Sequence, residues 1–184
     1  DLLIGVSQNP WPADRSQKVD SSAGKVFLLH HALDWAAELF SLGHRNIAGL
    51  LESKTGRIFS TEHGLNGGDE LNRLEPGQNY GWPLATHGAP YTSYSSEVGF
   101  SNGRHSNASF NSPIFSWLPS IAVSNLIELD GFHPMWDGDY LVSTLKGRSL
   151  HRLRLNEGRV VYDEAVYIAE RIRDILQFKN SIYL

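Results

Sequence analysis

Residues 121–168 read IAVSNLIELDGFHPMWDGDYLVSTLKGRSLHRLRLNEGRVVYDEAVYI, and this stretch decides the fold. Apolar runs alternate with turn residues, and the leucines and arginines of 150–155 nearly alternate, as in a half-buried antiparallel strand. The pattern predicts four strands, at 121–129, 140–145, 150–155 and 159–168. They are joined by Asp130-Gly131, Lys146-Gly147 and Asn156-Glu157-Gly158. Four consecutive antiparallel strands over about 50 residues are typical of one β-propeller blade.

Shorter strand patterns lie on both sides of this stretch. We expect strands at 2–6, 25–29, 49–52, 57–61, 69–74, 173–177 and 181–184. Residues 32–42 have the spacing of one or two helical turns. Residues 75–118 are rich in Gly, Ser, Asn, Pro and Tyr without sustained periodicity, and a connection of that length is usually functional or mobile.

These elements predict an all-β chain that forms one partial propeller domain, 1–184. We divide it into a blade remnant (1–42), a blade with a long insertion (43–118), a complete blade (119–168) and the start of the next blade (169–184). An open partial propeller would expose strand edges and apolar faces. We therefore expect the chain to belong to a longer protein, or to need missing propeller blades as partners.

Composition excludes several classes of protein. The 184 residues are 41% hydrophobic and 20% charged, with a net charge of −4, which gives no reason to expect a nucleic-acid partner. No apolar run approaches the roughly 18 residues of a membrane span, and no signal peptide is visible. The absence of cysteine excludes disulfides, zinc–thiolate sites and thiol nucleophiles.

Three polar, glycine-rich runs precede the complete blade. They are Gly43-His44-Arg45-Asn46, the run from Thr61 to Asn72 (TEHGLNGGDELN), and Asn79-Tyr80-Gly81-Trp82-Pro83. Segments of this composition do not form element interiors, so we interpret them as loops whose shape serves a function.

In this order, the runs resemble the soluble pyrroloquinoline quinone (PQQ)-dependent aldose sugar dehydrogenases, the glucose/sorbosone dehydrogenase family. The resemblance extends from about Asp14 to Leu184 and rests on seven segments: 22–26, 41–46, 61–72, 79–83, 117–124, 145–147 and 171–174. It implies a six-bladed β-propeller of four-stranded antiparallel blades, of which this chain is about half, and it favours a loop for 32–42.

The resemblance also implies an activity. The parent protein would be a periplasmic or secreted quinoprotein oxidoreductase that oxidises an aldose at C1 to the lactone, with hydride transfer to PQQ and with calcium as a second cofactor. Its partners would be the sugar and an electron acceptor, a quinone or a cytochrome.

Two catalytic positions follow from the resemblance. Arg45 and Asn46 match the pair that binds the reactive quinone carbonyl, where a permanently charged guanidinium suits developing negative charge. The alternative for Arg45 is that it caps a strand or pairs with an acid.

Calcium ligands are implied in the second and third runs. Gly64 and Leu65 match backbone ligands of the calcium that also binds the quinone, with leucine where the family usually has proline. Glu70, with the backbone of Tyr80, matches a structural calcium site. Alternatively, Asp69 and Glu70 only cap a turn or face solvent.

The remaining positions match residues that line or bind the quinone. Lys146, Arg171 and Arg173 would meet its carboxylates, because PQQ is a tricarboxylate. Arg171 and Arg173 should share one face of an extended segment, an arrangement that an ordinary strand also explains. The other cofactor-lining positions are His63, Trp117 and Ser120, with a loop histidine and a buried core tryptophan as the alternatives.

Departures from the family pattern concern both the base and the loops. The family's general-base histidine lies on a blade upstream of Asp1, so we expect the 184 residues alone to be inactive. Ile47-Ala48 replace the usual Pro-Gln, Val123 replaces a proline and Asn125 replaces a glycine.

Two other functions remain open at this point. One is a non-catalytic propeller that binds a protein or glycan, although such a module has no reason to keep Arg45, Asn46, Lys146, Arg171 and Arg173 together. The other is a calcium-dependent propeller hydrolase, which would need carboxylates converging on a central ion.

Overall fold

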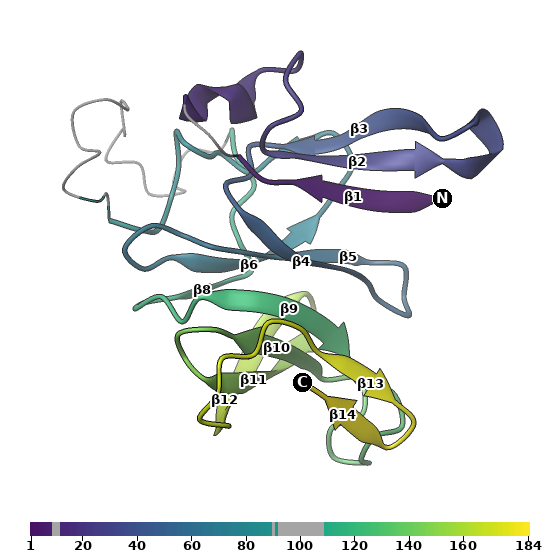
Figure 1. The fold of residues 1–184 in the computed structure, drawn as a ribbon, viewed down its shortest axis with the longest axis vertical. Coiled ribbons are helices and arrows are strands. Elements are labelled where there is room, and N and C mark those ends of the chain that lie inside the picture. The colour runs from purple at the N-terminus through teal and green to yellow at the C-terminus, as the bar shows by residue number, and fades with distance from the viewer. Residues whose placement is uncertain (9–11, 90, 92–108) are drawn as a thin grey trace.

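Three four-stranded sheets lie one below another in the computed structural model, which describes residues 1–8, 12–89, 91 and 109–184 (Figure 1). The first sheet has the order β1-β2-β3-β7, the second β4-β5-β6-β8 and the third β12-β11-β10-β9. A two-stranded hairpin, β13-β14, follows the third sheet. The chain is therefore all-β with four-stranded sheets, as the sequence predicted.

The strands of the first sheet are β1 (Leu2–Val6), β2 (Lys25–His30), β3 (Ala36–Leu42) and β7 (Gln78–Asn79). Those of the second are β4 (Ile47–Glu52), β5 (Ile58–Glu62), β6 (Asp69–Leu74) and β8 (Phe115–Trp117). The third contains β9 (Val123–Glu128), β10 (Tyr140–Thr144), β11 (Ser149–Asn156) and β12 (Arg159–Tyr167). The hairpin strands are β13 (Leu176–Phe178) and β14 (Ser181–Tyr183), and two short 3₁₀ helices are η1 (Ala13–Gln17) and η2 (His31–Leu33).

The stretch 121–168 forms the third sheet with its four strands at the predicted places. Leu150 and Leu153 are buried and Leu155 is partly buried, whereas Arg154 between the last two is exposed. The predicted β1 is also confirmed, and β4, β5 and β6 begin or end within two residues of their predicted bounds.

Four expectations about the strands were wrong. Residues 36–42 are not a loop but β3, which pairs along its length with β2; only its second half is buried, so it carries no alternation. The stretch 75–118 contains β7 and β8, which are too short for a sequence pattern, and its residues 90 and 92–108 lie outside the described ranges. The first sheet is not purely antiparallel, because β7 runs parallel to β3. The last hairpin begins at Leu176, three residues after the predicted start of its first strand.

Apolar side chains fill the spaces between neighbouring sheets. One cluster, with Phe59, Leu71, Trp117 and Val142, joins the second sheet to the third. Another, with Val26, Phe40, Leu74 and Tyr80, joins the first sheet to the second. The sheets are thus held face to face by hydrophobic packing, which fixes the loops at their ends relative to one another.

Both helices in the described ranges are short 3₁₀ turns, and neither could cross a lipid bilayer.

Candidate active site

The register of the second sheet brings the polar runs to one end of the sheet. Ile47 pairs with Glu62, Glu62 with Glu70, and Asp69 with Trp117. The loops that precede β4, connect β5 to β6 and follow β8 therefore emerge at the same end.

Loops of the third sheet emerge beside them. The backbone N–H of Lys146 donates to the carbonyl of Ile121 (3.0 Å), and the N–H of Ile172 donates to the carbonyl of Thr144 (3.1 Å). We call the segments 43–46, 63–68, 118–122, 145–148 and 171–173 together the loop end. Every predicted site residue except Glu70 and Tyr80 lies in this set or borders it, since Trp117 is the last residue of β8.

Asp69 connects the loops of the second and third sheets. Its side chain is inaccessible to solvent. Oδ1 accepts the N–H of Gly64 (3.0 Å), whereas Oδ2 accepts the hydroxyl of Ser120 (2.6 Å) and the N–H groups of Ile121 (3.0 Å) and Ala122 (2.6 Å). Of the two interpretations of Asp69, this arrangement supports the cap, and it commits the Ser120 hydroxyl to the same carboxylate.

Trp117 is buried in the core cluster between the second and third sheets. Its indole N–H donates to Asp163 (3.2 Å), which also accepts a bond from Nδ1 of His151 (2.7 Å). These contacts agree with the alternative of a buried core tryptophan.

Arg45 is held at both its backbone and its side chain. Its N–H donates to Glu62 Oε2 (3.3 Å), and Nη1 donates to the carbonyl of His63 (3.0 Å). The guanidinium carbon lies 5.3 Å from the centre of the Trp82 ring, a cation–π distance. The neighbouring Asn46 accepts the N–H of His63 through its carbonyl (3.0 Å).

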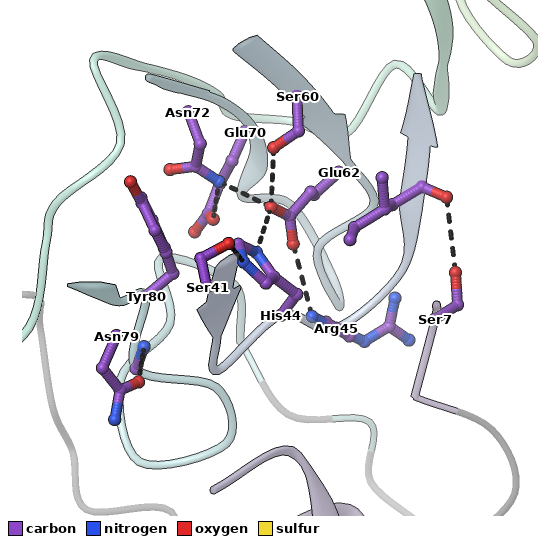
Figure 2. Close-up of polar contacts among 12 residues, drawn as sticks. Ser7, Ser41, His44, Arg45, Ser60, Glu62, Glu70, Asn72, Asn79 and Tyr80 are labelled. Carbon is purple, nitrogen blue, oxygen red and sulfur yellow. Dashed lines mark hydrogen bonds and ion pairs between the residues drawn. The ribbon is translucent and has the colours of Figure 1, made fainter. Parts of the chain in front are cut away.

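A buried network that was not predicted from the sequence surrounds Glu62, which accepts the backbone N–H of Arg45. Figure 2 shows the Glu62 carboxylate facing His44, Ser60 and Asn72, and all four residues are buried. Oε1 accepts bonds from His44 Nδ1 (2.8 Å), Ser60 Oγ (2.9 Å) and Asn72 Nδ2 (3.0 Å). A signal was present, because Ser60 and Glu62 are two residues apart and share one face of a strand.

The network stabilises an ionised Glu62. Burial alone would raise the pKa of its carboxyl group, but the nearby charge of His44 and the bonds from His44, Ser60 and Asn72 outweigh burial and lower the pKa. Because an ionised carboxylate only accepts hydrogen bonds, the proton in the bond to His44 belongs to Nδ1.

Glu70 and Tyr80 line a common pocket with Glu62, Arg45 and Trp82. Its cavity volume of about 10 Å³ is roughly the space of one water molecule. The enclosed space is thus of the size of a water molecule or a single ion. Asn72 donates its amide to Glu70 (3.3 Å) as well as to Glu62, and its own Oδ1 is buried without a hydrogen-bond partner.

The Gly64–Gly68 loop is tight enough to bring backbone oxygens together. A Cβ added at Gly64 would lie 2.3 Å from the carbonyl oxygens of both Gly67 and Gly68. The Leu65 side chain is buried against Ala13 and Trp82, away from solvent. Carbonyl oxygens gathered in a glycine loop are the donor set that Ca²⁺ prefers. In the described ranges, however, no three His, Asp or Glu side chains are grouped as a metal site.

The predicted quinone-binding cations lie at the surface of the loop end. Lys146, Arg171 and Arg173 are exposed, and their side chains form no hydrogen bond or ion pair with any described residue. Ile172 between the two arginines is buried, so the expected alternation is present. Three uncompensated cations can bind an anionic group.

Comparison with known proteins supplies the family. The sequence profile described as Glucose / Sorbosone dehydrogenase matches residues 2–184. The aldose sugar dehydrogenase YliI of Escherichia coli is 33% identical over 144 residues, which are 76% of this chain and 38% of that protein. Quinoprotein glucose dehydrogenase B of Acinetobacter calcoaceticus is 43% identical over 47 residues, 26% of this chain and 10% of that protein.

A solved structure agrees with the fold. The crystal structure of the soluble aldose sugar dehydrogenase from Escherichia coli, in the apo-form, superposes with a TM-score of 0.84 at 27% identity, over 98% of this chain and 56% of that one. The chain spans about half of that structure and between 34% and 38% of the curated relatives that it matches over most of its own length.

Proposed function

This chain belongs to the glucose/sorbosone dehydrogenase family, and from that premise we propose that the intact protein is a PQQ-dependent aldose dehydrogenase. It would oxidise an aldose at C1 to the lactone, and bound PQQ would supply the hydride acceptor. The observation that supports this most is the loop end, where contacts run without interruption from Arg45 through His63, Gly64 and Asp69 to the segments that carry Ser120 and Lys146.

Different residues of the loop end would bind different parts of the quinone. Arg45 and Asn46 would bind the quinone carbonyl, where a fixed guanidinium stabilises developing negative charge. Lys146, Arg171 and Arg173, exposed and unpaired among the described residues, would bind the quinone carboxylates. His63, Trp117 and Ser120 would form walls of the site. For Trp117 and Ser120, their bonds to Asp163 and Asp69 make a positioning role more consistent than direct contact.

Calcium would bind at two places. The backbone of Gly64 and Leu65 would hold the ion that also contacts the quinone, and Glu70 with the Tyr80 backbone would hold a structural ion. The one-ion size of the Glu70 pocket and the carbonyls crowded around Gly64 fit this role. The calcium-dependent hydrolase is less consistent with the site, because Asp69 is committed to backbone donors.

We further propose that the three sheets are successive blades of a six-bladed propeller, with boundaries at 1–42, 43–118, 119–168 and 169–184. β13-β14 would begin a fourth blade. Arg45, Gly64, Lys146 and Arg173 would then converge near the ring axis. By family resemblance, the intact protein would act in the periplasm or outside the cell and pass electrons to a quinone or a cytochrome.

The test is a dye-reduction assay on the intact protein with PQQ, calcium and a panel of aldoses. Arg45→Ala and Lys146→Ala should each lower the rate, because each removes a cation proposed to contact the quinone. Arg148→Ala, on the same exposed turn as Lys146, is the matched control and should leave the rate unchanged. Binding of a glycan or protein without any turnover would favour the non-catalytic module instead.

A further inference from the structure

Glu62 accepts hydrogen bonds from four residues in different segments of the site. Through Oε1 it accepts from His44, Ser60 and Asn72, and through Oε2 from the backbone of Arg45. Its partners come from three places: the loop before β4, β5 itself, and β6. The carboxylate is therefore a junction between the segment that carries Arg45 and the sheet that carries Glu70.

His44 is fixed from every side. Opposite Glu62, its Nε2 lies 2.9 Å from the hydroxyl of Ser41. Its ring stacks on Tyr80 with centroids 4.8 Å apart and an angle of 24° between the planes, and no part of the side chain reaches solvent. The contacts with Glu62 and Tyr80 therefore hold the ring of His44, the residue before Arg45, in place (Figure 2).

The Arg45 side chain depends on the same anchor at its other end. Its Nη1 donates to the carbonyl of His63, which directly follows Glu62 in the chain. Backbone and guanidinium of Arg45 are therefore tied to two consecutive residues at the end of β5. A shift of Glu62 would move both attachment points.

Asn72 extends the junction to the pocket of Glu70. Its Nδ2 lies 3.0 Å from Glu62 and 3.3 Å from Glu70, so one amide is shared by two carboxylates. The position of Glu70 is thereby coupled to that of Glu62, which it also faces across the β5–β6 pair.

Burying a carboxylate among polar partners is a costly way to gain stability, because well-packed apolar residues often stabilise a protein as much. The hydrogen bonds to Glu62 do fix the positions of their donors. Resting on the proposed function, we propose that Glu62 is a positioning residue, which aims the Arg45 guanidinium at the quinone and links it through Asn72 to the cation pocket of Glu70.

The test replaces Glu62 by glutamine in the intact protein. Glutamine keeps the shape but turns one oxygen into a donor, which opposes the N–H of Arg45 or of His44. The control is Asp163→Asn, which weakens another His–carboxylate contact, His151–Asp163 (2.7 Å), on strands that do not reach Arg45.

Two measurements without turnover decide the proposal. Amide hydrogen exchange at residues 44–46, without cofactor, should accelerate at least tenfold in Glu62→Gln and stay unchanged in Asp163→Asn. Quinone affinity, from absorbance titration, should fall about tenfold or more in Glu62→Gln. It should not fall further when the same change is made in the Arg45→Ala background, because the two residues then act through one contact.

Each outcome has a separate meaning. Unchanged exchange at 44–46 would overturn the anchoring of Arg45. A full additional loss of quinone affinity in the Arg45→Ala background would also overturn the proposal, because Glu62 would then act by general destabilisation. If the wild-type protein binds no quinone, the proposed function fails, while the exchange result still decides whether Glu62 anchors Arg45.

Discussion

At the scale of single residues, the loop end depends on a few buried polar side chains. Asp69 is one of them, because its carboxylate bonds to a loop of the second sheet and to the segment that leads into β9. These hydrogen bonds hold the two segments together where the chain is rich in glycine and has few apolar side chains to pack.

We therefore predict that Asp69→Asn destabilises the protein. Asparagine offers a single acceptor oxygen, so at least one N–H group would face an amide donor. Bonds to charged acceptors contribute about 1.5–3 kcal/mol, so the free energy of unfolding should fall by about 2–4 kcal/mol. Urea denaturation measures it. Glu170→Gln, an exposed carboxylate, is the control, and an equal loss in both variants would contradict the prediction.

Tyr80 is a second such residue. Its hydroxyl donates to the carbonyl of Arg73 (2.6 Å) and accepts the N–H of Glu75 (3.0 Å). Burial raises the pKa of this tyrosine to about 12. The folded state thus favours the protonated phenol. A buried phenolate could no longer donate to the Arg73 carbonyl, and its charge would lack hydration.

The stability that Tyr80 contributes should consequently depend on alkaline pH. A pKa raised on folding gives stability that is present below pH 10, the ordinary value, and lost as pH rises towards about 12. We expect a loss of about 2 kcal/mol between pH 9.5 and about pH 11.5 in urea titrations. Tyr80→Phe should be less stable at pH 8 but show a smaller alkaline loss, and Tyr167→Phe, an exposed tyrosine, should retain the full loss.

At the scale of elements, strands with long partners were predictable and short ones were not. The third sheet followed from turns and alternation because each strand pairs along most of its length with its neighbour. β8 has three residues, and it is specified by its register against β6, a contact distant in sequence. The prediction of a loop at Ala36–Leu42 was wrong because the first half of this strand is exposed, so its sequence lacks an apolar alternation.

The helix η1 is another element that depends on a distant contact. Lys25, on β2, is completely buried and donates through Nζ to the carbonyls of Arg15 (3.1 Å), Ser16 (2.9 Å) and Ala23 (2.8 Å). The helix in turn donates to the Trp82 carbonyl through Ser16 Oγ and Gln17 Nε2, each at 2.6 Å. One ammonium group thereby supports the turn beneath Arg45.

Lys25→Met should loosen this support. Methionine keeps the volume but removes the ammonium donor from three carbonyls, of which those of Arg15 and Ser16 still accept a backbone N–H. Stability should therefore fall by about 1–3 kcal/mol. Amide exchange of residues 79–83 should also become faster. Lys18→Met removes only an exposed ion pair with Asp14 (2.8 Å); because solvent screens such a pair, this control should change stability little. Protection of 79–83 that survives Lys25→Met would contradict the link between η1 and the turn.

At the scale of the whole molecule, the family was predictable from the order of the motifs, and the four-stranded sheets were predictable from the strand patterns. The roles of single residues within the site were harder to predict. Ser120 and Trp117 stood in matching segments, yet their side chains bond to Asp69 and Asp163. Glu62 and His44 lay within the quoted runs without being singled out. Only the pair Ser60 and Glu62 was visible as spacing along one strand, whereas the bonds to His44 and Asn72 join different segments of the chain.

The activity of the whole molecule gives the last prediction. The intact protein should reduce dye with aldoses when PQQ and calcium are present, and the 184 residues expressed alone should not. They superpose on 56% of the length of a related enzyme, so nearly half of a ring-shaped pocket would have to come from elsewhere. The family resemblance predicts that the base that takes the sugar proton lies in that other part, and general-base help is worth about 10²–10⁴ in rate. Robust turnover by the 184 residues would show that the base lies within them. If the intact protein binds PQQ and calcium but oxidises no sugar, the loop end binds the cofactors without catalysing sugar oxidation.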